Sequence, residues 1–182
     1  MTNERVKLVS DVQLEITRIL PATCERVWEY LTDPELRQKW FCAGATGNAP
    51  GQEFVMDFDH SRISDSDPPQ SVNCSNDPIV VRGIISTYEP PHKLAYRWPG
   101  ESEEDESLVT IELTQQGEYT RLHLVHSRLT NPEFQKGASA GWHAHLDLLL
   151  DLIEGKEARD FWEHFGNVQA EYEQLISDSS KA

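Results

Sequence analysis

The stretch Ser139–Gly155, SAGWHAHLDLLLDLIEG, decides the fold that this sequence predicts. Its large apolar residues recur at helical spacing and therefore share one helix face. They are Trp142, Leu146, Leu149, Leu150 and Ile153. The opposite face carries His143, Asp147, Asp151 and Glu154. Gly155 stands where such a helix would end. So apolar a face needs a broad surface to pack on, and the segments before the helix must supply it as a curved sheet.

Six segments upstream alternate apolar and polar residues with a period of two, which predicts strands with one buried face. They are Val12–Leu20, Glu53–Asp59, Ile79–Tyr88, Lys93–Trp98, Val109–Thr114 and Arg121–His126. The alternation fails at Arg18, which predicts a bulge or a strand end there. Gly83 predicts a bulge in the third segment.

Short helices separate the first two strands. Thr23 is a candidate N-cap for one, and Asp33, followed by Pro34, is a candidate N-cap for another. Asn131 opens the later helical region, where Gly137 and Gly141 are candidates for a break.

The predicted organisation is one α+β domain over residues 12–155, with an antiparallel six-stranded sheet wrapped around the long C-terminal helix. Residues 1–11 and 177–182 are expected to be disordered tails. Residues 156–176 carry a second apolar stripe and predict an extra C-terminal helix. The segment from His60 to Asp77 is rich in Ser, Asp and Pro and predicts a long exposed loop.

Composition narrows the classes of function. The 182 residues include 16 basic and 31 acidic ones, a formal net charge of −15. This charge repels phosphate backbones and anionic lipids, so we expect neither a nucleic-acid nor a membrane partner. No apolar run approaches the length of a membrane span, and the first residues lack the apolar core of a signal peptide, so we expect a cytoplasmic protein. The cysteines number three, Cys24, Cys42 and Cys74, and are expected to be free thiols.

An ordered set of short motifs resembles one known family. The set consists of Pro21-Ala22 with Val27-Trp28, Leu31-Thr32-Asp33-Pro34, Lys39-Trp40, Glu89-Pro90-Pro91 with Leu94, Tyr96 and Trp98, Val109–Leu113, Thr120–Leu122, Gly141-Trp142, Leu146-Asp147 and Leu152–Gly155. It resembles the START-like or SRPBCC superfamily, which has the birch-pollen-allergen fold. Within that superfamily the chain is similar to the family named for the activator of the heat-shock-protein-90 ATPase. The resemblance covers roughly Leu14 to Gly155. The loop at His60–Asp77 and the extension after Gly155 depart from it.

The resemblance implies a helix-grip fold with an internal cavity. Members of this superfamily bind hydrophobic ligands, cyclise polyketides or assist a chaperone, and they share no universal catalytic set. The resemblance therefore implies a fold and a range of functions, and no catalytic residues are transferred to this chain.

The inward faces of the predicted strands and helix supply the candidate ligand-binding residues. They are Trp40, Phe54, Met56, Tyr96, Trp98, Leu122, Leu124, His126, Trp142, Leu146 and Leu149. A pocket lined by aromatic residues with a few polar groups suits an apolar ligand. The same residues could instead pack on one another as a solid core, because linings and cores use the same residue types.

Several polar residues have both a functional and a structural interpretation. His126 could orient a ligand or act as an acid or base, but a histidine satisfied by a neighbouring hydroxyl is favoured. His143 and Asp147 are four apart, and a surface ion pair is favoured. His143 and His145 point apart on a helix, so no metal site is expected. Cys42 is expected to be buried and inert.

Three functions remain as alternatives. The first is binding of an apolar or aromatic small molecule or lipid. The second is an interaction module that assists a chaperone, which would suit the acidic surface. The third is a polyketide cyclase-like enzyme, which no nucleophile–base pair, metal set or cofactor motif supports. An enzyme is therefore the less favoured class, and no cofactor is expected.

Overall fold

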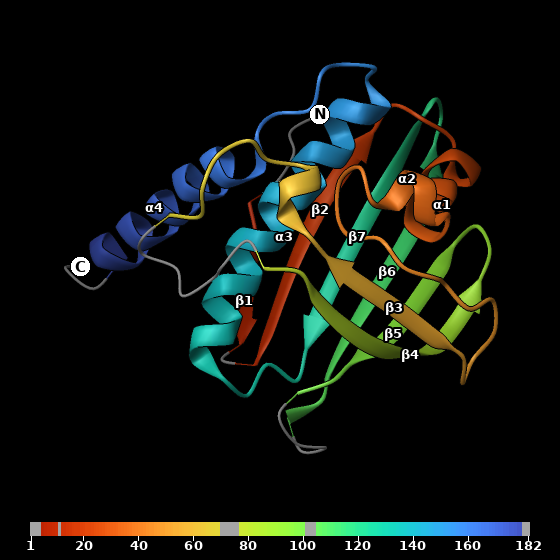
Figure 1. Ribbon diagram of the computed structural model, residues 1–182, viewed down its shortest axis with the longest axis horizontal. Coiled ribbons are helices and arrows are strands. Elements are labelled where there is room, and N and C mark those ends of the chain that lie inside the picture. The colour runs from red at the N-terminus through yellow and green to blue at the C-terminus, as the bar shows by residue number, and fades with distance from the viewer. Residues whose placement is uncertain (1–4, 11, 70–76, 101–104, 180–182) are drawn as a thin grey trace.

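A computed structural model describes residues 5–10, 12–69, 77–100 and 105–179, with side chains as far as Tyr172. It is an α+β fold in which a curved antiparallel sheet grips one long helix (Figure 1). The predicted helix-grip fold is therefore confirmed. The described residues contain no helix that is both long enough and apolar enough to cross a membrane.

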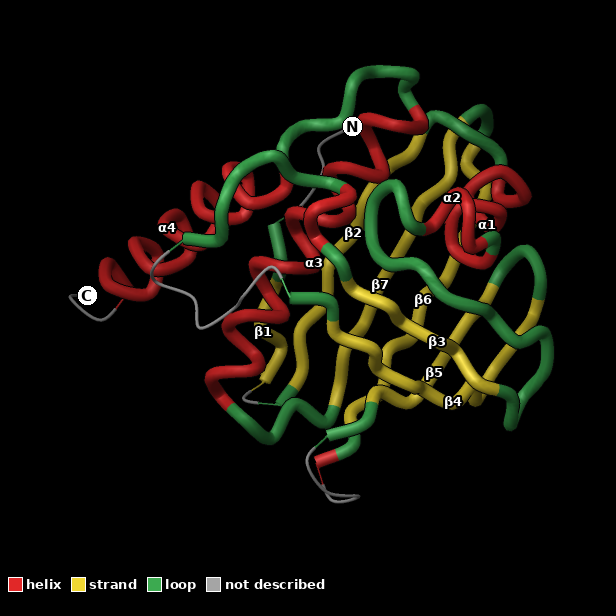
Figure 2. Tube along the Cα trace, viewed as in Figure 1, coloured by secondary structure: helices red, strands yellow, loops and turns green. Residues whose placement is uncertain are grey.

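The described residues form a sheet of seven strands rather than the predicted six, in the spatial order β1-β2-β7-β6-β5-β4-β3 (Figure 2). Their bounds are β1 Lys7–Ser10, β2 Gln13–Leu20, β3 Glu53–Phe58, β4 Ile79–Glu89, β5 Lys93–Trp98, β6 Ser107–Gln116 and β7 Tyr119–Ser127. The additional strand β1 lies in the segment that was predicted to be a disordered tail. It pairs with β2, with Leu8 opposite Leu14. All four of its residues are exposed, so no burial alternation marks it in the sequence.

Caps on the helices follow the predicted residues. The helix α1, Cys24–Thr32, has Thr23 as its N-cap, and α2, Pro34–Arg37, has Asp33. The long helix α3, Pro132–Ile153, begins at the Asn131 cap, whose side chain accepts hydrogen bonds from two backbone amides. It ends before Gly155, which has a φ of 69°. The helix runs unbroken through Gly137 and Gly141, so neither glycine interrupts it.

Arg18 does not end the first predicted strand. The strand β2 keeps its alternation, and Arg18 occupies an inward position between Ile16 and Leu20. Its Nε donates a hydrogen bond of 2.8 Å to Oδ1 of Asp147 on α3. The predicted bulge is therefore wrong, because a carboxylate on the helix provides a partner for a buried guanidinium in the strand.

The helix α4, Phe161–Ser179, covers the side of α3 that the sequence placed in solvent. Asp147 and Asp151 are consequently buried, with exposed fractions of 9% and 5%. The segment before α4 also orders part of the loop predicted at His60–Asp77. The short 3-10 helix η1, His60–Arg62, stacks on Phe161, and Asp160 accepts hydrogen bonds from residues 64–66. Residues 70–76 of that loop lie outside the described part of the chain.

Gly83 is not at a bulge. The register of β4 and β5 shifts between Ile85 and Thr87, whereas Gly83 pairs regularly with Phe54. A Cβ at position 83 would lie 2.6 Å from the carbonyl oxygen of Arg97. The glycine therefore serves a close approach of two strands.

Two glycine substitutions test this account in opposite directions. We expect Gly83→Ala to lower the free energy of unfolding by about 2 kcal/mol, since backbone must move to admit the methyl group. Gly137→Ala should raise it by up to about 1 kcal/mol, because its Cβ meets nothing within 4 Å and alanine favours helix. Urea unfolding measures both. A Gly83→Ala protein as stable as the parent would contradict the close approach.

Candidate binding site in the helix-grip interior

The interior between the sheet, α1–α2 and α3 contains a small cavity. Its volume is about 10 Å³, which is room for about one water molecule. The lining residues are Leu31, Arg37, Trp40, Phe41, Phe54, Leu94, Tyr96, Ile111 and Trp142. In this conformation the aromatic side chains fill most of the space that a ligand would need.

Four of the predicted binding residues border this cavity, namely Trp40, Phe54, Tyr96 and Trp142. Five further ones are fully buried in the core around it, namely Met56, Leu122, Leu124, Leu146 and Leu149, whereas Trp98 is partly exposed. Sequence reasoning missed five lining residues, Leu31, Arg37, Phe41, Leu94 and Ile111. Leu94 could have been found, because it precedes Tyr96 by two positions on one strand face. Arg37 carries no such signal.

Arg37 brings a fully buried cation to the cavity wall. Its guanidinium lies 4.3 Å from the centre of the Phe54 ring. It donates hydrogen bonds to the carbonyl oxygens of residues 42, 43, 44 and 55 and to the Thr46 hydroxyl. Among the described residues, no carboxylate forms an ion pair with it. Its hydrogen bonds are satisfied, but its charge is balanced only by carbonyl dipoles.

Tyr96 supplies the polar atom that faces the cavity. Its ring stacks on Phe54 with 4.2 Å between centroids. No hydrogen bond joins its hydroxyl to any described residue, whereas every fully buried side-chain nitrogen or oxygen there has a partner. The hydroxyl therefore keeps some exposed surface, and Tyr96 is one of the residues that line the cavity. Burial raises the pKa of Tyr96 well above 10, so this hydroxyl keeps its proton and can donate it in a hydrogen bond.

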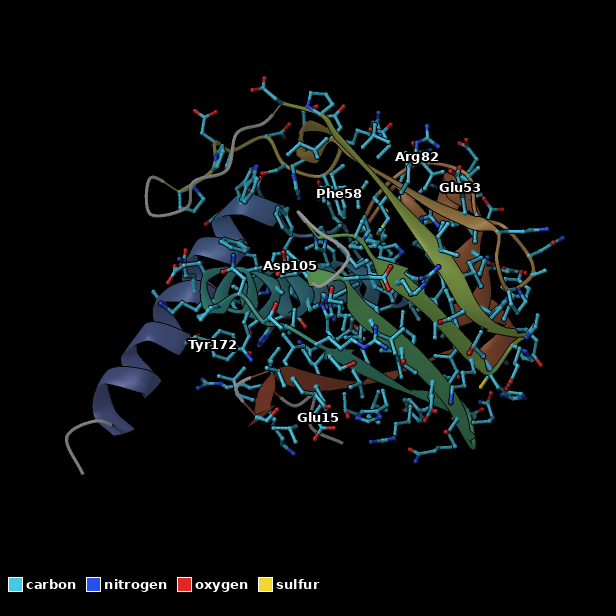
Figure 3. The ribbon with its side chains drawn as sticks, turned by 90° about the horizontal axis from the view of Figure 1, so that it is seen from below. Glu15, Glu53, Phe58, Arg82, Asp105 and Tyr172 are labelled. Atoms are coloured by element: carbon cyan, nitrogen blue, oxygen red, sulfur yellow. The ribbon has the colours of Figure 1, made fainter. Side chains whose placement is uncertain are left out.

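A half-exposed aromatic cluster lies beside the cavity. We call Trp98, Phe41, Phe58, Phe134 and Trp142 the Trp98 cluster, since the ring of Trp98 lies 5.7 to 6.5 Å from each of the other four. Phe41 and Trp142 are buried in the cavity wall, Trp98 and Phe58 are partly exposed, and Phe134 is 40% exposed. Phe58 comes from the end of β3 (Figure 3). The cluster therefore joins the interior to the surface.

His126 is satisfied by a neighbouring hydroxyl, as the sequence predicts. Its Nδ1 accepts from Trp142 Nε1 at 3.1 Å, which leaves the ring proton on Nε2 facing Ser107 Oγ at 2.8 Å. Burial lowers the pKa of His126 to about 3.

Cys42 is buried, as predicted, and burial raises the pKa of its thiol to about 12.

The predicted pair of His143 and Asp147 exists, with 3.3 Å between Nε2 and Oδ2, but it is not a surface pair. It belongs to a network between α3 and α4 that also includes Arg18, Arg159 and His164. Burial alone would raise the pKa of Asp147. Hydrogen bonds from His143 and His164 and the charge of Arg18 outweigh it and lower that pKa far below its usual range.

Acid should destabilise this fold partly through His126. Its folded pKa of about 3 lies below the unfolded value of about 6.5, so the stabilising effect is complete above pH 6.5 and is lost as the pH falls. Between these two pKa values, this one group makes the free energy of unfolding fall by about 1.4 kcal/mol for each pH unit of acidification. We expect His126→Gln to remove that slope between pH 6 and 5, as urea unfolding at each pH would measure. Identical slopes in both proteins would contradict the burial of a neutral ring.

The comparisons with known proteins agree with this architecture. Residues 21–154 match the family described as activator of Hsp90 ATPase homolog 1-like protein. A Bordetella parapertussis protein solved by NMR is 33% identical, with a TM-score of 0.79 over 95% of this chain and 90% of that one. CalU16 from Micromonospora echinospora is 22% identical, with a TM-score of 0.65 over 90% and 88%. The Aha1 dimer from Colwellia psychrerythraea is 16% identical, with a TM-score of 0.60 over 79% and 96%.

No curated protein matches the chain. The last two structural likenesses support the fold alone. The family match covers most of the chain, and it ends at residue 154, before α4. The chain therefore belongs to the activator of Hsp90 ATPase homolog 1-like family, within the START-like superfamily.

Proposed function

We propose that this protein binds an aromatic small molecule that carries an acceptor oxygen, with its ring in the helix-grip interior. The observation that carries the proposal is that Tyr96 lines the small aromatic cavity and that no described residue forms a hydrogen bond with its hydroxyl. An oxygen of the ligand would accept a hydrogen bond from it. The ligand oxygen would supply the partner that the described residues do not give to this donor, a hydrogen bond of about 1 kcal/mol.

Arg37 favours a ligand oxygen with negative charge, such as a carboxylate. Arg37 lines the cavity, and its guanidinium contacts carbonyl oxygens, the Thr46 hydroxyl and the Phe54 ring, with no carboxylate paired to it among the described residues. Coulomb attraction is strong where water is excluded, even when no direct contact forms. The aromatic walls supply the apolar contact for the rest of the ligand.

Binding requires the cavity to expand, since about 10 Å³ holds no aromatic ring. The Trp98 cluster is the route that we assign. Phe41 and Trp142 belong both to the cluster and to the cavity wall, and Phe134 is exposed. Rotation of these rings would admit a flat ligand and leave the sheet unchanged.

The other two functions have less support. A chaperone-related role rests on the family description and on the acidic net charge of −15. A cyclase-like enzyme would need an acid or base at the cavity. Among the described lining residues, Tyr96 and Arg37 are the ionisable groups, and Tyr96 stays protonated.

The experiment compares two ligands and two variants. The ligands are 2-naphthoate and naphthalene, which share the ring system and differ in the oxygen group. Tyr96→Phe removes the cavity hydroxyl, and Tyr88→Phe is the matched control, because Tyr88 packs on Trp28 outside the cavity lining. Equilibrium dialysis with absorbance detection gives the dissociation constants.

We expect 2-naphthoate to bind the parent more tightly than naphthalene. Tyr96→Phe should weaken 2-naphthoate binding by about 2- to 10-fold, the value of one hydrogen bond, and leave naphthalene binding unchanged. Tyr88→Phe should change neither. The proposal fails if neither ligand binds, or if Tyr96→Phe weakens both ligands equally.

A further inference from the structure

We propose that His143, Asp147 and His164 form a binding site for a divalent transition-metal ion at the interface of α3 and α4. This site is separate from the cavity and does not depend on the proposed ligand. Two imidazoles and one carboxylate are donors that suit zinc and its neighbours in the first transition row. Sequence reasoning expected no metal, because no ligand spacing was recognised and His143 and His145 point apart on a helix; it did not consider His164.

The three donor atoms already converge. Oδ2 of Asp147 lies 3.3 Å from Nε2 of His143 and 2.9 Å from Nε2 of His164. All three lie within 4.8 Å of one another. Two ligands of a tetrahedral zinc ion, each about 2.0–2.1 Å from the metal, are separated by roughly 3.3 Å. An ion can therefore bind with small side-chain shifts.

Further contacts orient the donors as outer-shell groups do in metal sites. Nδ1 of His143 lies 2.8 Å from the Tyr172 hydroxyl, which also accepts the backbone N–H of Val6 at 2.8 Å. Tyr172 projects from α4 toward the body of the domain (Figure 3). Arg18 occupies Oδ1 of Asp147 and so leaves Oδ2 as the metal ligand.

Arg159 opposes the metal. Its Nη1 lies 3.4 Å from Oδ2 of Asp147 and 3.4 Å from Nε2 of His164, so it competes for the same atoms. Its stronger contacts are with Asp151, at 2.7 Å from Nε and from Nη2. Asp151 balances the charge of Arg159, as Asp147 balances that of Arg18. Removing the Arg159 cation should therefore tighten metal binding, which a purely structural ion-pair network does not predict.

The site is reachable from solvent. The side chains of His143 and His164 are 14% and 20% exposed. Because the ligands come from two helices, a bound ion would hold α4 on α3 and raise the unfolding temperature by mass action.

The test uses tag-free, chelator-treated full-length protein, with Zn²⁺ followed by calorimetry and Co²⁺ by visible absorption. His164→Asn and His143→Asn remove ligands, and Arg159→Gln removes the competing cation. His123→Asn is the matched control, because His123 also faces a carboxylate, with Nε2 3.1 Å from Glu15 Oε2 on the sheet. Circular dichroism confirms that each variant folds.

We expect one equivalent of metal to bind. The visible absorption spectrum of bound Co²⁺ should differ from that of free Co²⁺ as expected for coordination by nitrogen ligands. Either ligand variant should weaken binding at least 10-fold, Arg159→Gln should strengthen it several-fold, and His123→Asn should leave it unchanged. The proposal is overturned if neither ion binds stoichiometrically. It is equally overturned if His123→Asn weakens binding as much as His164→Asn does.

Discussion

The buried ion pair between Arg18 and Asp147 sets how the long helix sits on the sheet. Arg18 occupies an inward position on β2, between apolar residues, and its exposed fraction is 1%. A guanidinium in that position is tolerated only with a charged partner. Asp147 can provide that partner only when α3 has one particular orientation about its own axis, because Arg18 Nε and Asp147 Oδ1 must come within hydrogen-bonding distance, here 2.8 Å. The same rotation brings Trp142 to the cavity wall and to Nδ1 of His126.

The polar side of α3 then needs a cover, and α4 supplies it. Asp147 and Asp151 would be exposed if the domain ended at Gly155. With α4 in place they are buried and bonded to Arg159 and His164. The apolar residues Phe161 and Trp162 of α4 also contact His60, with Phe161 stacked on its ring and Trp162 tilted against it. The segment outside the family match therefore packs as part of the domain, and its polar contacts form the proposed metal site.

Sequence patterns predicted those parts of the fold in which the polarity of each residue matches its burial. Period-two alternation identified six strands, and Thr23 and Asp33 identified two caps. The pattern failed where a polar residue is buried because a residue distant in the sequence pairs with it. Arg18 appeared to end a strand because its carboxylate lies 129 positions away. Arg37 was missed because its partners are backbone carbonyl oxygens, which no residue type reveals. Whether the candidate residues enclose a cavity or pack as a solid core depends on how completely their side chains fill the interior. The periodicity of the sequence carries no information about that.

A double-mutant cycle on the Arg18–Asp147 pair tests the central claim most directly. We would measure the free energy of unfolding of the parent, Arg18→Met, Asp147→Leu and the double variant. Asp147→Leu should cost about 3–5 kcal/mol, because it removes the carboxylate that pairs with the buried Arg18 guanidinium. Arg18→Met should cost less, because Asp147 keeps its contacts with His143, Arg159 and His164. The double variant should recover about 2 kcal/mol or more of the sum of the two single changes. Strict additivity would contradict the account, because it would mean that the two residues act independently and do not together set the rotation of the helix.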